Sequence, residues 1–416
     1  MEKNVVASPE LAAEGQRRIE WVRRNMPILN QIERQFAAEK PFAGKRIVVC
    51  IHLEAKTAYL ALVLRAGGAT VAVTGSNPES TKDDVVAALA AEGLHVYARH
   101  GAPPDEMRRY MGFALELKPH VVIDDGGDLV ELLHESHRAD GADMLGACEE
   151  TTSGVLRARA RAKAGQLRFP VVLVNDARCK YLFDNVHGTG QSVWDAVLRS
   201  TNLVLAGKTV VVVGYGWCGR GVALRAQGLG AHVVVCEVDP IKAADALMYG
   251  CRVMPLADAC GIADVVLTVT GVRHTLRREH FPLLKHNVLL ANAGHFWEEI
   301  DVAALTELAA EHQELRTNVE GFRLADGRWL NLLGNGNIVN IACGDGHPAE
   351  IMDMSFALQL LAAHHVVTES SSLAPGVHPV PAAIDARVAQ LKLAAAGVAI
   401  DALTNDQKEY LAHWEA

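Results

Sequence analysis

Short apolar runs alternate with longer segments of helical periodicity along most of the chain. A helical pattern covers residues 9–36, and apolar runs follow at 46–51, 69–74, 94–98, 121–123 and 171–174. Apolar runs separated by helical patterns are typical of parallel strands joined by helices, which cover both faces of the sheet. The first half of the chain therefore predicts an α/β domain.

A second alternating unit begins near residue 206. Residues 209–213 and 233–236 are apolar runs on either side of a helical segment, and further strands are predicted at 265–269, 288–292 and 338–341. The remaining segments are an apolar helix at 349–366, a proline-containing surface crossing at 367–385 and a helical tail from 384. This second half also predicts a parallel sheet covered by helices.

The chain has 416 residues, which is more than one hydrophobic core usually holds. We expect two Rossmann-like, doubly wound parallel-sheet domains with a short C-terminal helical tail. The expected bounds are 1–187 plus 348–385 for a substrate-binding domain, 188–347 for a dinucleotide-binding domain and 386–416 for the tail.

Composition and charge narrow the class of protein further. Half of the residues are apolar, and the formal net charge of −9 leaves no basic field that would attract nucleic acid. No apolar run is long enough to span a bilayer, and the first residues lack the apolar core of a signal peptide. The eight cysteines stand singly, without metal-ligand spacing. These features fit a cytoplasmic enzyme with no metal, no nucleic-acid partner and no membrane partner.

The segment from residue 206 to 240 carries the most specific motif. Gly214, Gly216 and Gly219 stand in G-x-G-x-x-G spacing, directly after an apolar run and before a helical segment. In this arrangement the glycines form a tight turn, let the backbone approach a pyrophosphate and allow close helix–strand packing. Glu237 follows at about the distance of the acid that accepts from a ribose 2′-OH and repels a 2′-phosphate. The glycines alone are weak evidence, but with this strand, helix and acid they predict NAD rather than NADP.

Polar clusters follow several predicted strands of the first half. The acidic loop 124–128 (DDGGD) is either solvated or part of a site, and residues 149–153 (EETTS) begin a helix whose hydroxyls could serve only as caps. Lys180 is followed closely by Asp184 and Asn185, so a cation, a carboxylate and an amide come together. Because open α/β sheets bind ligands at the carboxyl ends of their strands, we expect a site there.

Two loops of the second half carry histidines. His295 follows the predicted strand 288–292, and His347 precedes the apolar helix. A lone histidine in a loop is often incidental, but loops that leave the strand ends of a dinucleotide domain line the crevice where nicotinamide lies. Both histidines are therefore candidates for contact with substrate.

Taken together, these motifs resemble one family. The segments that carry the resemblance are 52–62 (HLEAKTAYLAL), 124–128, 149–152, 180–185, 214–221 (GYGWCGRG), 292–296 (NAGHF) and 344–353 (GDGHPAEIMD). The chain resembles S-adenosylhomocysteine hydrolase along nearly its whole length, and its finer features are similar to a short branch found among archaea and thermophilic bacteria. That branch lacks an extended C-terminal tail whose Lys and Tyr reach a neighbouring subunit's NAD, and this chain likewise stops at Ala416.

The resemblance implies a particular use of NAD. The 3′-OH of a bound nucleoside is oxidised with tightly held NAD, which makes the C4′-H acidic because the carbanion becomes an enolate. A base removes that proton and the 5′ substituent is eliminated. Water then adds and the ketone is reduced again, so the cofactor is regenerated in each turnover.

By the same resemblance, Lys180 is expected to be the acid/base at the 3′-OH, with Asp184 and Asn185 fixing it. The other catalytic candidates are Glu150 at the ribose hydroxyls, His52 and Asp125 at C4′ and the 5′ leaving group, and His295 on the 5′ side. The implied cofactor contacts are Gly214, Gly216, Gly219, Glu237, Thr151, Thr152, Ser153, Thr270, Asn292 and Asn340. The implied substrate contacts are Glu54, Lys56, Thr57 and His347.

The chain also departs from the common form of the family. Glu54 and Lys56 stand where a Thr and a Glu read the adenine amino edge, and a lysine cannot accept from an exocyclic amine. The short branch shares this change, so a nucleoside with a 6-oxopurine base, such as inosine, is an open alternative. Further departures are Glu79, Lys82, Trp297 and the segment 335–337 (NGN). They are compatible with surface drift or with an altered substrate.

The leading hypothesis is the reversible hydrolysis of S-adenosyl- or S-inosyl-homocysteine to a nucleoside and homocysteine. An alternative is a nucleoside dehydratase, which expels water from a C5-hydroxymethyl sugar by the same redox and elimination steps. A minor alternative is a non-catalytic NAD-sensing homologue. The resemblance also implies a homotetramer or homodimer, with hinges near 185–195 and 345–350.

Overall fold

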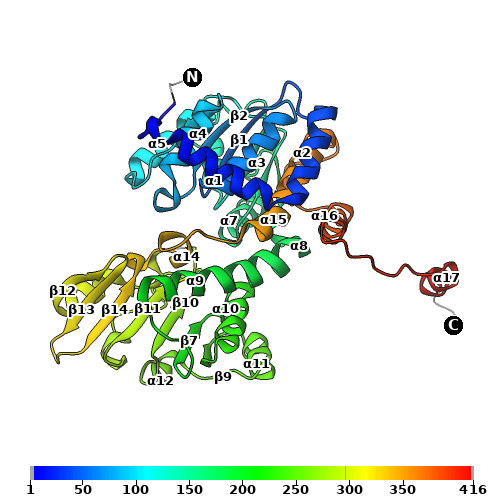
Figure 1. Cartoon of the computed structure of the whole chain (residues 1–416). Helices are drawn as coiled ribbons and strands as arrows, with labels where there is room; N and C mark the ends of the chain where they lie inside the picture. Colours follow the sequence, from blue (N-terminus) through cyan, green and yellow to red (C-terminus); the bar gives the residue numbers. More distant parts are fainter. Residues whose placement is uncertain (1–3, 296, 414–416) are drawn as a thin grey trace.

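The computed structural model describes residues 4–295 and 297–413 and folds them around two β-sheets. Figure 1 shows the two sheets, each with its own helices, and the chain crossing between them near α8 and α9 and again near α14 and α15. Within these described ranges, no helix combines the length and the apolar character that a membrane crossing needs.

The first sheet is seven-stranded and parallel throughout, in the order β15-β6-β5-β4-β1-β2-β3. Its strands are β1 Arg46–Ile51, β2 Thr70–Gly75, β3 His95–Tyr97, β4 Val121–Asp124, β5 Gly146–Glu149, β6 Pro170–Leu173 and β15 Gly376–Pro379. The predicted parallel α/β sheet is confirmed.

Alternate residues of strand β1 enter two different cores. Ile47 and Val49 pack on one face, and Val48 and Cys50 on the other, because successive side chains of a strand point to opposite sides. The first face is covered by α1 Ala12–Arg24, α2 Pro27–Glu39, α3 Ala55–Ala66, α4 Asp83–Ala91, α15 Ala349–Thr368 and α16 Ala382–Ala395. The second face is covered by α5 Pro104–Leu115, α6 Asp128–His134 and α7 Thr152–Lys163.

The second sheet is eight-stranded and mixed, in the order β12-β13-β14-β11-β10-β7-β8-β9. Its strands are β7 Thr209–Val213, β8 His232–Cys236, β9 Arg252–Val253, β10 Val265–Thr268, β11 Val288–Asn292, β12 Ala309–Arg316, β13 Val319–Leu324 and β14 Trp329–Leu333. Its helices are α9 Thr189–Thr201, α10 Trp217–Gly228, α11 Pro240–Met248, α12 Leu256–Cys260, α13 Val302–Leu308 and α14 Val339–Ala342. The strand–turn–helix–strand unit at the glycines is confirmed.

One strand prediction in this half is wrong. Residues 338–341 were expected to form a strand, but the helix α14 begins at Val339, and Ile338 makes only an isolated bridge to Asn292. The place beside β11 is taken by β14, the last strand of an antiparallel meander that the parallel prediction omitted. Strand β12 is largely exposed and polar, so it lacks the apolar signal on which the prediction depended.

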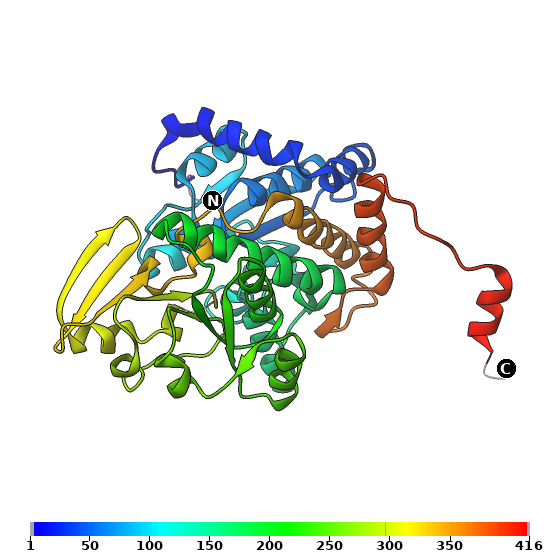
Figure 2. The same cartoon turned by 60° about the horizontal axis from the view of Figure 1, so that its bottom comes forward.

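The ends of the chain also differ from the sequence pattern. The predicted helix 9–36 is broken before Pro27, because proline disfavours helical geometry in the residue before it. The crossing 367–385 contains β15, which extends the first sheet. The tail forms two helices, α16 and α17 Asn405–Ala412, and Figure 2 shows α17 away from the body of the protein.

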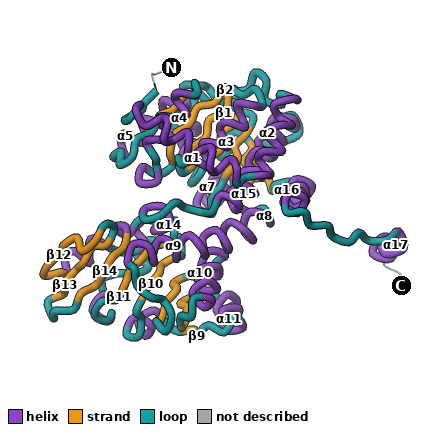
Figure 3. The backbone as a smooth tube through the Cα atoms, viewed as in Figure 1, coloured by secondary structure: helices purple, strands orange, loops and turns teal. Residues whose placement is uncertain are grey.

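The order of the strands locates the expected ligand site in each sheet. From β1 the chain continues to β2 and β3 on one side and then to β4, β5 and β6 on the other, so the loops after β1 and β4 flank a switch point. The second sheet repeats this at β7 and β10. Ligands of doubly wound sheets bind at such points. Figure 3 shows the two sheets in orange, with the helical connection through α8 and α9 between them. The exact domain bounds given above stay a prediction.

Candidate active site

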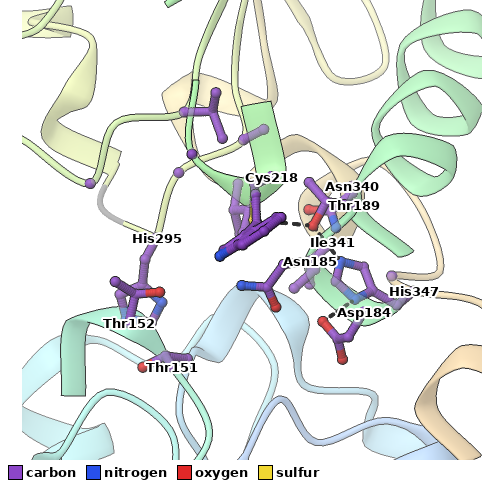
Figure 4. Close-up of a pocket in the computed structure, with 18 of the residues that line it drawn as sticks. Thr151, Thr152, Asp184, Asn185, Thr189, Cys218, His295, Asn340, Ile341 and His347 are labelled. Carbon is purple, nitrogen blue, oxygen red and sulfur yellow. Dashed lines mark hydrogen bonds and ion pairs between the residues drawn. The ribbon is translucent and has the colours of Figure 1, made fainter. Parts of the chain in front are cut away.

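The switch points of the two sheets open into one shared cavity of about 2390 Å³. Loops that follow β1, β4 and β5 line it from the first sheet, and loops that follow β7, β8 and β10 line it from the second. Figure 4 shows part of this cavity, with side chains from both halves of the chain facing the same space.

The glycine turn forms one wall of the cavity. Gly214 has a φ of 101°, and a Cβ there would lie 2.9 Å from Val269 O, so only glycine fits. A Cβ on Gly219 would lie 2.1 Å from Gly214 O, which shows how closely the helix packs on the turn. Gly216 lines the cavity, and a Cβ there would meet nothing within 4 Å. The turn therefore leaves open the space that a pyrophosphate would fill at the start of α10.

Glu237 lies at the end of β8 and also lines the cavity. Its carboxylate accepts from the backbone N–H groups of Tyr215 at 2.7 Å, Val238 at 2.7 Å and Asp239 at 3.0 Å. Burial would raise the pKa of Glu237, but these N–H donors lower it below its ordinary value. An ionised acid beside the turn suits ribose hydroxyls, which can donate to it.

The remaining predicted cofactor residues divide into two groups. Thr151, Thr152, Ser153, Thr270 and Asn340 line the cavity, whereas Gly219 and Asn292 do not. Asn292 Oδ1 accepts from the Gly294 N–H at 2.8 Å, and its Nδ2 donates to Gly336 O at 3.0 Å, so it shapes the neighbouring loops. Asn340 Oδ1 is buried without a hydrogen-bond partner in the described chain, and an amide N–H of a bound group would satisfy it.

Lys180 is at the centre of a buried polar cluster that also lines the cavity. Its ammonium lies 3.0 Å from Asp184 Oδ1, 3.0 Å from Asn185 Oδ1 and 3.2 Å from Glu150 Oε1. Lys180 ends α8 Arg178–Lys180, and the two following partners lie in a π-helix, Tyr181–Gly188. π-Helical segments are frequent at functional sites because they re-aim side chains that an α-helix would place elsewhere.

Helix α15 supports the two carboxylates of this cluster. Ser355 Oγ donates to Asp184 Oδ2 at 2.6 Å, and Gln359 Nε2 donates to Glu150 Oε2 at 2.5 Å. Ser355 and Gln359 are fully buried and stand four residues apart, on one face of the helix. Neither was among the predicted site residues, although polar residues inside an otherwise apolar helix were an available signal.

The charges of the cluster balance one another. Burial lowers the pKa of Lys180, but the carboxylates of Asp184 and Glu150 outweigh it and raise that pKa. Burial raises the pKa of Asp184, but Lys180 and His347 bring it well below its ordinary value. For Glu150 burial dominates over Lys180, and its pKa rises to about 7. At neutral pH the cluster thus holds a charged pair beside a carboxyl group near its titration midpoint.

His52 and Asp125 meet at the switch point of the first sheet. His52 Nε2 lies 3.6 Å from Asp125 Oδ2, and His52 Nδ1 lies 2.8 Å from Ser80 Oγ. The Ser80 hydroxyl donates to Asn77 O at 2.7 Å, so it accepts from His52 Nδ1–H and leaves Nε2 without a proton. Burial also lowers the pKa of His52, so the ring is neutral at pH 7. Ser80 was not among the predicted site residues.

The two predicted loop histidines reach across from the second half. His295 Nε2 lies only 3.3 Å from where a Cβ on Gly126 would stand, so this loop closes on the acidic loop of the first sheet. His347 Nδ1 lies 3.0 Å from Asp184 Oδ1, and its Nε2 lies 3.2 Å from Thr189 Oγ1, as Figure 4 shows. The structure brings both histidines to the cavity.

The other predicted substrate contacts lie where the chain passes from β1 into α3. Lys56 Nζ lies 2.9 Å from Glu54 Oε2 and donates to Asp345 O at 2.9 Å, while Thr57 Oγ1 donates to His52 O at 2.6 Å. Glu54, Lys56 and Thr57 all line the cavity. Thr151, predicted as either cap or contact, accepts from the Gly154 N–H at 3.3 Å and caps α7 while also lining the cavity.

The departures from the family pattern fall in different places. Lys82 lines the cavity, while the segment 335–337 lies in a short turn in which Asn335 has a φ of 52°. Phe296 and the side chain of Trp297 lie outside the described residues. Among the residues that the structure describes, no three His, Cys, Asp or Glu side chains form a group that could hold a metal ion.

Comparisons with known proteins agree with this arrangement. Residues 3–145 match the family described as S-adenosyl-L-homocysteine hydrolase, and residues 185–346 match its NAD binding domain. The adenosylhomocysteinase of Pyrococcus abyssi is 53% identical over 405 residues, which cover 97% of this chain and 96% of that protein. The chain belongs to the S-adenosyl-L-homocysteine hydrolase family.

Other relatives within the family carry two different names. The adenosylhomocysteinase of Thermotoga maritima is 50% identical and covers 96% of this chain and 99% of that protein. The S-inosyl-L-homocysteine hydrolase of Methanocaldococcus jannaschii is 51% identical and covers 96% of each. The resemblance stated from the sequence motifs, including its archaeal and thermophilic branch, is therefore confirmed, and the second half is an NAD-binding domain.

Proposed function

We propose that this protein catalyses the reversible, NAD-dependent hydrolysis of an S-nucleosyl-homocysteine, with adenosine or inosine as the nucleoside. The observation that carries the proposal is the meeting of the Lys180 cluster, the His52–Asp125 pair and the glycine turn in one cavity. Relatives of about this identity are named for the hydrolysis of adenosyl and inosyl substrates. NAD, when bound, supplies the reversible oxidation of the 3′-OH.

Lys180 and Glu150 serve the 3′-OH in this proposal. The Lys180 ammonium is held by Asp184 and Asn185 and can donate to the 3′ oxygen as a ketone forms or is reduced. Glu150, with its pKa of about 7, accepts from a ribose hydroxyl and can take up a proton at neutral pH. General acid–base help of this kind contributes about 10² to 10⁴ in rate.

His52 serves C4′ and the 5′ side. Its Nε2 has no proton in the tautomer that Ser80 imposes, so it can accept the C4′ proton and later return one to the 5′ leaving group. Asp125 Oδ2 accepts from Ser76 Oγ at 2.8 Å, and its second oxygen, Oδ1, is buried without a hydrogen-bond partner in the described chain. Asp125 then stabilises the imidazolium that forms, as a buried carboxylate beside a histidine does.

Glu54 and Lys56 recognise the 6-position of the purine. Lys56 can donate to O6 of hypoxanthine while Glu54 accepts from its N1–H; with adenine, Lys56 donates to N1 and Glu54 accepts from the amine. Because this pair offers both a donor and an acceptor, it can bind either base. A competition experiment with the two substrates measures which base the protein prefers. Glu54→Gln replaces one carboxylate oxygen by an amide donor and should change that preference.

The test is to incubate the protein with S-adenosylhomocysteine, S-inosylhomocysteine and a panel of 5′-hydroxy nucleosides. Thiol release and mass loss of water are followed separately. Thiol release from a thioether substrate supports the hydrolase, whereas loss of water without any thiol chemistry makes the protein a dehydratase. If bound NAD is present but no nucleoside exchanges its C4′-H for deuterium, the protein is the non-catalytic homologue.

We further propose that the domains have the bounds 1–187 plus 348–385, 188–347 and 386–416, and that the chain forms a homotetramer or homodimer. Apolar side chains of the tail support the assembly, because Ile400 is 72% exposed and Leu411 is 70% exposed in the single chain. Mass measurement by light scattering, with and without the tail from residue 397, tests it. A monomer for the full chain contradicts it.

A further inference from the structure

Two basic side chains on the wall of the cavity have no acidic partner within the described chain. Every other lysine or arginine that lines the cavity has a carboxylate at ion-pair distance; Lys56 pairs with Glu54, for example, and Arg18 pairs with Asp84. The two exceptions are Arg17 on α1 and Lys82 immediately before α4. Arg17 is exposed, whereas Lys82 is half-buried.

The backbone places Lys82 beside the histidine of the site. The Lys82 N–H donates to Leu53 O at 2.9 Å, and Leu53 directly follows His52. Two residues before Lys82, the Ser80 hydroxyl accepts from His52 Nδ1 at 2.8 Å. Lys82 and His52 are thus held by the same pair of loops, and both residues line the cavity.

Helix α1 adds the second cation to the same rim. A Cβ on Gly15 would lie 1.9 Å from Asp84 O, so α1 packs directly on the first turn of α4. Arg18 Nε reinforces the contact with Asp84 Oδ2 at 2.9 Å. Arg17 directly precedes Arg18 and lines the same cavity as Lys82.

We propose that Lys82 binds the carboxylate at the end of the 5′ substituent, with Arg17 at the rim beyond it. The inference rests on the proposed function, whose thioether substrate carries an α-amino acid at that end. Without a cation, this carboxylate would approach the Asp125 carboxylate, which lies beside His52, with nothing to offset their repulsion. A hydroxyl leaving group has no charge and would not need Lys82, so the residue selects the thioether substrate.

The test compares two substrates in two variants, Lys82→Gln and Lys82→Glu. One substrate is the S-nucleosyl-homocysteine and the other is its carboxamide, which lacks the negative charge. For the carboxylate substrate, kcat/KM should fall about tenfold in Lys82→Gln, as expected for an ion pair worth about 1.4 kcal/mol, and about a hundredfold in Lys82→Glu, chiefly through KM. For the carboxamide, the change should stay within about threefold, because no charge is left to pair.

Lys163→Glu is the matched control, because Lys163 is exposed at the end of α7, outside the cavity. Reversing its charge changes the net charge of the protein by as much as Lys82→Glu does. This control variant should leave the ratio of kcat/KM between the carboxylate and carboxamide substrates unchanged. An equal fall for both substrates in the Lys82 variants would show that Lys82 only supports its loop, and no fall would show that it has no contact; either result overturns the inference. If the wild-type protein releases thiol from neither substrate, the proposed function itself fails.

Discussion

Replacing Lys180 by Met tests the centre of the buried cluster. The change removes the cation that lies 3.0 Å from Asp184 and 3.2 Å from Glu150 and leaves two carboxyl groups facing each other. Breaking a buried ion pair by removing one partner costs about 3–5 kcal/mol of stability. Part of this cost is offset, because Lys180 is what lowers the pKa of Glu150 against burial, and without it Glu150 takes up a proton at neutral pH.

The substitution should lower the rate of cofactor reduction more than it lowers the stability of the fold. Without the Lys180 donor, formation of reduced nicotinamide on mixing with adenosine or inosine should slow by about 10² to 10⁴. Single-turnover absorbance of the reduced cofactor measures this rate. The content of bound NAD should be unchanged, because the hydrogen bonds that hold Glu237 beside the glycine turn do not involve Lys180. Reduction within about threefold of the wild-type rate would remove Lys180 from its assigned role.

A second measurement does not depend on turnover. In the variant, Glu150 keeps a pKa above that of the unfolded chain, so the folded state binds the extra proton and loses stability as pH rises through the folded pKa. The midpoint of thermal unfolding should therefore fall more steeply between about pH 6 and 8 in Lys180→Met than in the wild type. Lys163→Met, at an exposed position, should show neither effect.

Three other predictions follow from the same geometry. Gly216→Ala should keep the unfolding midpoint of the wild type but lose bound NAD, since its Cβ meets no protein atom and fills part of the cavity. Gly219→Ala should lower the unfolding midpoint, since its Cβ meets Gly214 O. Thermal unfolding curves and the content of bound cofactor, measured for both variants, distinguish these two effects. Glu237→Ala should weaken NAD binding and reduce the preference over NADP, which titration with both cofactors measures. The acid limb of the pH profile for cofactor reduction should lie near pH 7, because Glu150 must ionise, and Glu150→Gln should remove it.

Local signals were sufficient for part of the site. The glycine turn and the acid after β8 were predicted together, because a tight turn, a strand and a helix are all properties of one continuous segment. The prediction also included Lys180, Asp184 and Asn185, which stand close together in the chain. The π-helix that follows Lys180 brings the other two side chains to its ammonium. The resemblance to a family supplied their expected roles, which remain proposals until the variants are measured.

Partners from distant segments were missed for a physical reason. Ser355 and Gln359 bond to the cluster from a helix that lies far along the chain, and Ser80 sets the tautomer of His52 from another loop. A hydrogen bond depends on the position of both groups, and sequence spacing defines only one of them. The wrong strand at 338–341 has the same origin, since the place beside β11 was decided by competition with β14.

The sequence by itself determined the alternation of strands and helices, the dinucleotide turn and the family, because each depends on residue types at short or fixed spacing. Only the tertiary structure decided which polar groups share one cavity, which carboxyl group titrates near neutral pH, and which cations are left unpaired. Burial and the distances between charges set those properties, and both arise when segments from opposite ends of the chain pack together. Lys82 illustrates the difference: in the sequence it is one departure from a family pattern, and in the fold it is an unpaired cation on the wall of the site.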